Sequence, residues 1–199
     1  MRIGILTSGG DCPGINATIR GVCKTAINYY GMEVIGIHSG FQGLLTKDVE
    51  SFTDKSLSGL LNLGGTMLGT SREKPFKKGG VVSDVDKPAL ILRNIREMGL
   101  DCVVCIGGNG TQKTAAKFAA MGVNIVSVPK TIDNDIWGTD ISFGFDSAVS
   151  VLQSISLKRL SMRQVSKPVK RYWGIFSVVV HLLLSTVISL RGWVVMQQN

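Results

Sequence analysis

Two glycine-rich turns, each placed between a short apolar run and a helix-forming segment, constrain the fold of this chain most. The first turn, Ser8-Gly9-Gly10, follows an apolar run at residues 3–7, and the second, at residues 107–111, follows an apolar run at 102–106. Strands that alternate with helices through such turns are typical of parallel sheets covered on both faces. We therefore expect an α/β fold: a doubly wound, mostly parallel sheet with helices on both faces.

The remaining pattern of residues 1–150 repeats this alternation. Pro88 begins one helical segment and Gly99 follows its end, which are the preferred positions of these residues at helix termini. In chain order we predict a strand at 3–7, a helix at 16–29, a strand at 34–37 that ends at residues 38–40, then a turn-rich region that contains residues 64–66 and 69–72, a helix at 88–98, a strand at 102–106, a helix at 112–121 and a strand at 124–128. Ligands of such sheets bind beyond the carboxyl ends of the strands.

Length and composition indicate a globular domain. The 199 residues are 44% hydrophobic and 18% charged, which is enough apolar chain for one full core and too apolar for a disordered protein. The 24 glycines are too many for a helical bundle and suit a fold with many tight turns. We place one folded lobe at residues 1–150 and a separate tail at 151–199.

Most of the net charge of +8 lies in the tail. Residues 1–146 hold fifteen Lys and Arg and fourteen Asp and Glu, a sum of +1, whereas residues 147–199 hold seven Lys and Arg and no acid, a sum of +7. A nucleic-acid-binding domain would carry its basic residues on the folded part of the chain. We therefore expect no nucleic-acid partner.

Cys102 and Cys105 have the C-x-x-C spacing of metal and redox sites, but they lie in an apolar run that reads as a buried strand. Residues three apart in a strand point to opposite faces, so we expect both thiols to pack in the core. No second C-x-x-C is present to complete a zinc site. The chain begins directly with a strand and shows no signal peptide, which favours a reducing, cytoplasmic location.

The tail is basic and irregular from residue 157 and apolar from 174 to 190. A membrane-spanning helix needs about twenty apolar residues, and this run is seventeen long and contains His181. A pair of buried strands, or a segment that does not complete a domain, is the preferred interpretation over a membrane span.

The two glycine turns are candidate phosphate sites. Glycine lets the backbone approach a ligand closely, and a helix N-terminus presents free amides to an anion. A plain tight turn is the alternative for Ser8-Gly9-Gly10, since neither the P-loop nor the dinucleotide fingerprint is present. In the second turn Asn109 can coordinate Mg²⁺ through its amide oxygen, or can simply be an Asn that tolerates a positive φ.

Asp133 and Asp135 follow the strand predicted at 124–128. In an extended loop both side chains would face the same side, where one accepts the proton of an attacking hydroxyl and the other orients it or holds a metal. Helix capping is the alternative for each aspartate. Lys130 can neutralise a phosphate and Arg72 can clamp one, with ordinary surface positions as the alternatives.

Taken together, these loops resemble 6-phosphofructokinase. The matching segments, in the order of that family, are GILTSGGDCPGIN at 4–16, GGT at 64–66, GTSR at 69–72, GGNGT at 107–111, PKTIDND at 129–135 and FGFDSA at 143–148. They cover residues 1 to about 150 and are highly specific in combination. The resemblance implies transfer of a phosphoryl group to the 1-hydroxyl of fructose 6-phosphate, giving fructose 1,6-bisphosphate.

The resemblance also implies a role for each matching residue. The nucleotide would be held by Gly10, Arg72, Glu73, Gly108, Asn109, Gly110 and Thr111, and the sugar phosphate would meet Thr131, Ile132 and Asp133. Asp133 would be the base and Asp135 would assist it. Asn109 stands where most relatives place an Asp that binds Mg²⁺. Gly110 favours ATP as the donor, while Lys130 is common in users of pyrophosphate.

The tail departs from the family. Full-length relatives are homo-oligomers whose second lobe carries a Met-Gly-Arg motif and grips the sugar phosphate, and neither feature is recognisable after residue 155. We expect a truncated or frame-shifted segment here. Three hypotheses follow: an ATP-dependent sugar-phosphate kinase, a nucleotide-binding fragment without turnover, and a protein tethered to a membrane by residues 174–190.

Overall fold

The computed structural model describes residues 1–77, 86–140 and 142–160. Its sheet has six strands in the order β3-β2-β1-β4-β5-β6. The strands are β1 (Arg2–Ser8), β2 (Glu33–Ile37), β3 (Val49–Phe52), β4 (Cys102–Gly107), β5 (Ile125–Thr131) and β6 (Phe143–Gly144). The helices are α1 (Ile15–Tyr30), α2 (Phe41–Thr46), the 3-10 turn η1 (Leu60–Asn62), α3 (Lys87–Glu97), α4 (Asn109–Ala120) and α5 (Phe145–Leu160). All strand pairs are parallel except β2 with β3, which confirms the predicted fold class.

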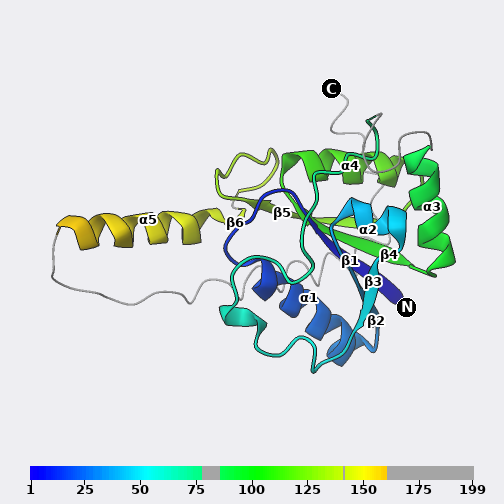
Figure 1. Ribbon diagram of the computed structural model, residues 1–199, viewed down its shortest axis with the longest axis horizontal. Helices are drawn as coiled ribbons and strands as arrows, with labels where there is room; N and C mark the ends of the chain where they lie inside the picture. The colour runs from blue at the N-terminus through cyan, green and yellow to red at the C-terminus, as the bar shows by residue number, and fades with distance from the viewer. Residues whose placement is uncertain (78–85, 141, 161–199) are drawn as a thin grey trace.

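Helices cover both faces of the sheet, with α1 on one side and α2, α3 and α4 on the other (Figure 1). The side chains of β4 alternate between the two layers. Cys102 and Val104 pack in the cluster that contains α1, whereas Val103 and Cys105 pack in the cluster under α2, α3 and α4. The prediction that the two cysteines face opposite ways is confirmed. Burial raises the pKa of Cys102 to about 11, so its thiol stays protonated in the core.

The region between Gly40 and Gly64 is more regular than expected. The sequence pattern predicted only turns there, but the structure has α2, the antiparallel strand β3 and η1. These elements are three to six residues long, too short for a helical or strand period to stand out in the sequence. Their packing on the sheet, with Phe41 and Phe52 buried, determines their structure.

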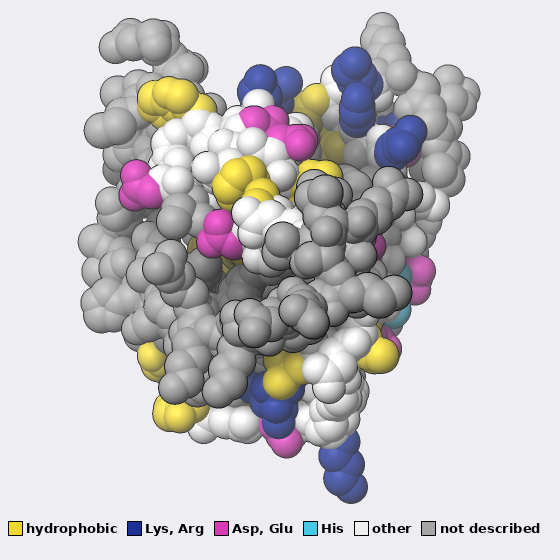
Figure 2. All heavy atoms as spheres, turned by 90° about the vertical axis from the view of Figure 1, so that its left-hand side faces the viewer, with side chains coloured by type: hydrophobic (Ala, Val, Ile, Leu, Met, Phe, Trp, Pro, Cys, Tyr) yellow, Lys and Arg dark blue, Asp and Glu magenta, His cyan; other side chains and the backbone are white. Residues whose placement is uncertain are grey.

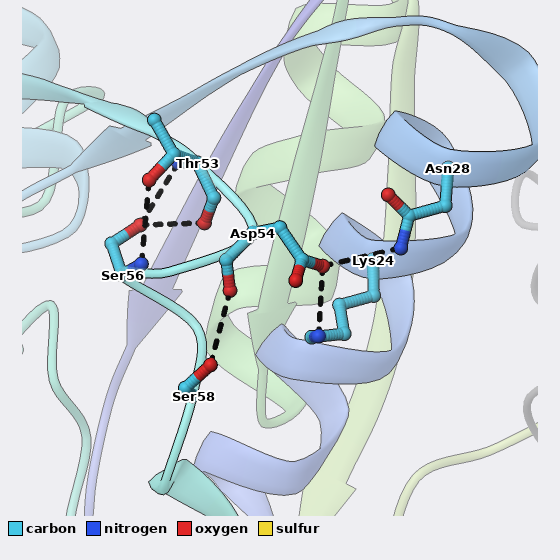
Figure 3. Close-up of polar contacts among 6 residues, drawn as sticks. All are labelled: Lys24, Asn28, Thr53, Asp54, Ser56 and Ser58. Carbon is cyan, nitrogen blue, oxygen red and sulfur yellow. Dashed lines mark hydrogen bonds and ion pairs between the residues drawn. The ribbon is translucent and has the colours of Figure 1, made fainter.

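Polar contacts join the segment after β3 to α1 (Figure 3). The carboxylate of Asp54 pairs with Lys24 at 2.7 Å and accepts a hydrogen bond from Asn28 at 3.2 Å. Next to it, Thr53 and Ser56 exchange hydrogen bonds between side chain and backbone. The side chains of Lys24 and Asp54 are 23% and 53% exposed, so this is a surface contact.

Helix α5 extends away from the body of the molecule (Figure 1). It runs to Leu160, so the irregular structure expected from residue 157 is wrong for its first four residues, 157–160. The helix also crosses residue 150, and the boundary placed there stays a prediction. The remaining basic tail and the apolar run at 174–190 lie outside the described residues. Within the described ranges, no helix combines the length and the hydropathy that crossing a membrane requires.

On the face at the α5 end, the described Lys and Arg side chains lie in separate groups near its upper and lower edges, with Asp and Glu among and between them (Figure 2). Charges of both signs are therefore interspersed over the described part of this face.

Candidate functional site

The carboxyl ends of β1, β4 and β5 lie side by side at one edge of the sheet. Ser8 is level with Gly107 across the β1–β4 pair, and Gly107 is level with Pro129 across the β4–β5 pair. The loops that follow these strands therefore open at the same edge. This places both glycine turns and the aspartate loop in neighbouring positions, as the sequence predicted.

The first loop, residues 9–14, has the open backbone that a phosphate site needs. Gly9 has φ 87° and Gly14 has φ 94°, values that favour glycine. Gly14 precedes the first residue of α1, and no side chain caps that helix. A Cβ added at Gly10 would meet no atom within 4 Å, so the backbone here is freely accessible.

The second loop is shorter than the sequence suggested, because α4 begins at Asn109 instead of residue 112. Asn109 and Gly110 are exposed in the first helical turn, while Thr111 is buried. The residue before the helix is Gly108, and no side chain caps the helix start. The turn predicted to cradle a phosphate is thus a helix N-terminus with exposed amides, which attracts anions through the helix dipole as well as through hydrogen bonds.

Gln112 holds the ends of two strands together, a role that sequence reasoning missed. Its side-chain amide donates to the carbonyl of Gly107 at 2.9 Å and to that of Val128 at 3.3 Å. The first carbonyl is on β4 and the second on β5, so Gln112 fixes the spacing of the two loops. No motif marks this residue; only its position one turn after Gly108 could have suggested it.

Lys130 connects the first loop to the strand that carries the aspartates. It lies in β5, its side chain is buried, and its ammonium donates to the carbonyl of Gly10. Burial lowers the pKa of Lys130, an effect that nearby Cys12 and Asp11 partly offset. A positive charge is therefore held directly beneath the first glycine turn.

The aspartate loop differs in shape from the extended loop that was expected. Strand β5 continues to Thr131, so the loop begins at Ile132. Asn134 has φ 52°, a left-handed conformation, and the assumption of an extended Asp133–Asp135 segment is wrong. The loop closes on itself instead, because the side-chain oxygen of Asn134 accepts hydrogen bonds from the backbone N–H and the hydroxyl of Ser142, at 3.1 and 3.2 Å.

The two aspartates have different surroundings. Asp135 accepts a hydrogen bond from the Thr131 hydroxyl at 2.8 Å, and the same hydroxyl accepts from the backbone N–H of Asp133 at 3.0 Å. Thr131 thereby ties both residues to the end of β5. Asp133 is exposed, and within the described ranges its carboxylate makes no ion pair or hydrogen bond. Ile132 beside it is also exposed, at 48%.

Cys12 joins the first loop to β6. Its thiol lies 3.6 Å from the carbonyl of Phe143, and it occupies the space beside Gly144 that a side chain would need. Gly144 also has φ 102°. Burial raises the pKa of Cys12 to about 11, so the thiol is a packing group at this junction instead of a nucleophile.

Arg72 lies on a segment that is tied to the same edge of the sheet. The hydroxyl of Thr7, at the end of β1, donates to the carbonyl of Gly69 at 2.7 Å. Arg72 itself is exposed. The carboxylate of Glu73 forms a buried ion pair with Lys87 at 2.7 Å.

No group of three or more His, Cys, Asp or Glu side chains that could hold a metal ion occurs within residues 1–77, 86–140 and 142–160. Exposed side chains that offer oxygen ligands at this edge include Asp11, Asn109, Asp133 and Asp135. Metal bound here would therefore need most of its ligands from a substrate or from water.

The sequence matches the phosphofructokinase family over residues 2–170. It is 96% identical over 151 residues to ATP-dependent 6-phosphofructokinase 3 of Bacteroides thetaiotaomicron, covering 76% of this chain and 45% of that protein. It is 53% identical over 152 residues to the ATP-dependent 6-phosphofructokinase of Spirochaeta thermophila, covering 74% and 42%. The pyrophosphate–fructose 6-phosphate 1-phosphotransferase of Dictyoglomus thermophilum is 45% identical over 160 residues, covering 80% and 44%.

Solved structures of phosphofructokinases share the fold of this chain. Phosphofructokinase of Pichia pastoris in the T-state superposes with a TM-score of 0.71 at 28% identity, covering 83% of this chain and 19% of that one. The phosphofructokinase of Saccharomyces cerevisiae gives a TM-score of 0.67 at 30% identity, covering 79% and 24%. The chain spans less than half the length of the curated relatives that it matches.

Proposed function

The chain belongs to the phosphofructokinase family, and on this premise we propose that its site transfers a phosphoryl group from ATP to the 1-hydroxyl of fructose 6-phosphate. The product is fructose 1,6-bisphosphate. One observation carries the proposal: two uncapped helix N-termini, a buried ammonium and an exposed carboxylate meet at one edge of the sheet. Phosphoryl transfer depends on positioning and on electrostatic stabilisation, and this edge supplies both.

We assign the nucleotide to the two glycine loops and the segment after Gly69. The set consists of Gly10, Arg72, Glu73, Gly108, Asn109, Gly110 and Thr111, in which Glu73 would act through its ion pair with Lys87 and not by touching the nucleotide. The exposed amides at the start of α4 would donate to phosphate oxygens, and the open backbone at Gly10 admits a second phosphate above Lys130. Arg72, exposed and close in sequence to the tie at Gly69, would clamp the phosphates from the side.

Mg²⁺ would be held mainly by the phosphates of the nucleotide, with Asn109 as the protein ligand. The exposed amide oxygen of Asn109 can serve this ion, which keeps several waters and takes few protein ligands, while the phosphates and not the helix N-terminus supply the charge that attracts it. When bound, the ion neutralises charge on the transferring phosphate.

We assign the sugar phosphate to Thr131, Ile132 and Asp133, and the chemistry to the two aspartates. Asp133 would accept the proton of the 1-hydroxyl as its oxygen attacks the γ-phosphorus, because its carboxylate is exposed and uncommitted. Asp135 would assist by fixing Thr131, to which the backbone of Asp133 is tied. Lys130 would offset the negative charge that gathers near the first loop.

The proposed donor is ATP, with pyrophosphate as the alternative. Gly110 has open space around it, so the α-phosphate of a nucleotide meets no side chain there. Lys130 is compatible with either donor. Relatives described as ATP-dependent and one described as pyrophosphate-using both match this chain.

We further propose that the protein is a homo-oligomer. Size-exclusion chromatography with light scattering will test this oligomeric state. The proposed location is cytoplasmic.

A second candidate function is nucleotide binding without turnover. It is favoured by the extent of the match, since the chain spans 45% of its 96% identical relative. Two measurements separate the candidates. Calorimetry with Mg-ATP tests binding, and a coupled assay of fructose 1,6-bisphosphate tests turnover with ATP and with pyrophosphate. Binding with turnover supports the kinase, binding alone supports the second candidate, and absence of both contradicts the assigned site. Turnover with pyrophosphate and not ATP contradicts the assigned donor.

A further inference from the structure

The residue directly after Arg72, Glu73, forms a buried ion pair with Lys87. Lys87 is not among the residues assigned to the site. The ammonium of Lys87, the first residue of α3, is 2.7 Å from the carboxylate of Glu73. The two side chains are only 3% and 6% exposed. Lys and Glu are almost never this buried unless they are paired, so the contact is a specific feature of the fold.

Local physics does not favour a lysine at this position. The N-terminus of a helix carries partial positive charge, so a cation in the first turn of α3 is unfavourable. Removing two charges from water also has a desolvation cost that their attraction often fails to recover, and a well-packed apolar pair is commonly as stable. What a buried charged pair does provide is direction, because the carboxylate and the ammonium stay paired only where the two backbones keep this separation. The pair is therefore better explained by the position that it imposes than by stability.

The position that it imposes is that of the loop around Arg72. On the N-terminal side of Arg72 the loop is fixed to the sheet by two hydrogen bonds. The Thr7 hydroxyl donates to the carbonyl of Gly69, and the backbone N–H of Ser39 donates to the carbonyl of Leu68 at 2.8 Å. On the C-terminal side of Arg72 the loop is held by the ion pair of Glu73 with Lys87. Arg72 lies between these two attachments, so the loop is anchored on both sides of it, and its own side chain is exposed.

A second contact on the C-terminal side of Arg72 is made by Phe76. Its ring packs on that of Phe118 in α4, with centroids 4.9 Å apart, and the ammonium of Lys117 lies 5.0 Å from its centre. This apolar contact holds the loop against α4, three residues beyond Glu73. The backbone next to Arg72 is held by the ion pair, together with the hydrogen bond from the Glu73 N–H to the Ser71 hydroxyl at 3.4 Å.

We propose that Lys87 is a positioning residue for nucleotide binding: through Glu73 it fixes the backbone that presents Arg72 to the phosphates. The inference rests on the proposed function for the ligand, but the anchoring itself is a property of the chain. It also gives Glu73 its role, since a carboxylate committed to Lys87 acts by holding the loop and not by touching the nucleotide.

Hydrogen exchange of this chain tests the anchoring without any nucleotide. In Lys87→Met and Glu73→Gln, amides of residues 69–77 should exchange about tenfold faster than in the wild type, while those of β1 and β4 keep their rates. Lys24→Met and Asp54→Asn are matched controls, since that pair has the same 2.7 Å separation but lies at the surface between a different loop and helix (Figure 3). Unchanged exchange at 69–77, or an equal rise in the controls, overturns the proposal.

Binding of Mg-ATP to the same variants tests whether the anchor acts through Arg72. Lys87→Met should weaken binding about tenfold in the wild-type background and less than about twofold when Arg72→Ala is already present. The charge exchange Glu73→Lys/Lys87→Glu restores the pair and should recover most of the affinity. Equal losses in both backgrounds mean a general structural effect and overturn the proposal. A wild-type chain that binds no nucleotide contradicts the proposed function, and the exchange rates then decide alone whether Lys87 anchors the loop.

Discussion

The two edges of the sheet use the same strands in opposite ways. At the amino edge polar groups are paired: the Arg2 backbone N–H donates to Asp101 at 2.7 Å, and its guanidinium contacts Glu33 at 2.9 Å and the carbonyl of Met98 at 2.8 Å. At the carboxyl edge Gly10 and Gly110 have no atom within 4 Å of where a Cβ would stand. The first edge holds the strands in register, and the second leaves donors for a ligand.

The N-termini of the helices at the carboxyl edge show the same contrast. Asp86 caps α3 by accepting from the backbone N–H of Ala89 at 3.2 Å, whereas α1 and α4 begin after glycines without a side-chain cap. Free first-turn amides are usually satisfied by a cap, by water or by a ligand. The difference shows that the fold satisfies one helix itself and leaves two open beside the proposed phosphate site.

The largest effect is expected at Asp133. Asp133→Asn removes the proposed base, and turnover in any active form of the protein should fall by about 10² to 10⁴. The affinity of this chain for Mg-ATP should stay within about twofold, because the carboxylate is assigned to the sugar and not to the nucleotide. A coupled assay and calorimetry measure the two quantities. A large loss of ATP affinity would mean that Asp133 serves the metal instead.

Gly144→Ala tests the junction beneath the open edge. The new methyl group would collide with the thiol of Cys12, and φ 102° is strained for alanine. The free energy of unfolding should drop by roughly 2 to 4 kcal/mol. Adding Cys12→Ala removes the collision but not the strain, so denaturant melts should show partial recovery. If the double variant is no more stable than Gly144→Ala, the collision is not the cause.

Gly110→Asp tests the open start of α4. The added carboxylate would repel the α-phosphate, and ATP affinity should fall at least about tenfold, a free-energy difference of about 1.4 kcal/mol. Gly110→Ala is the control: its methyl group meets no protein atom within 4 Å in a helical backbone and adds no charge, so the melting temperature should hardly change and ATP affinity should fall less than in Gly110→Asp. Equal affinity for ATP in Gly110→Asp and the wild type would remove the nucleotide from this turn.

The smallest effect on binding is expected at the opposite edge. Arg2→Ala removes contacts to Glu33 and Met98 and should lower the melting temperature. Nucleotide affinity should be unchanged, because Arg2 belongs to the edge away from the loops. Thermal melts with and without Mg-ATP measure both properties. A loss of affinity at a temperature well below the melt would show that the two edges are coupled.

The sequence predicted the alternating fold and the meeting of the loops because the strand runs are apolar, two of them end at glycine turns and a third leads into the aspartate loop. It failed where structure depends on contacts distant in sequence. The loop around the left-handed Asn134 is closed by Ser142, eight residues away, and the role of Gln112 depends on two strand ends. The sequence also did not show that Glu73 pairs with Lys87, which lies fourteen residues further on at the start of α3. Composition and spacing do not encode such pairings.

The central claim is that phosphate groups bind where the carboxyl ends of β1 and β4 open. The most direct test is amide chemical-shift mapping of this chain with Mg-ADP. We predict the largest shifts at Gly10 and at the first turn of α4, Asn109 to Thr111, with unchanged amides at Arg2, Glu33 and Asp101. No shifts at either glycine loop, or the largest shifts at the amino edge, would contradict the claim.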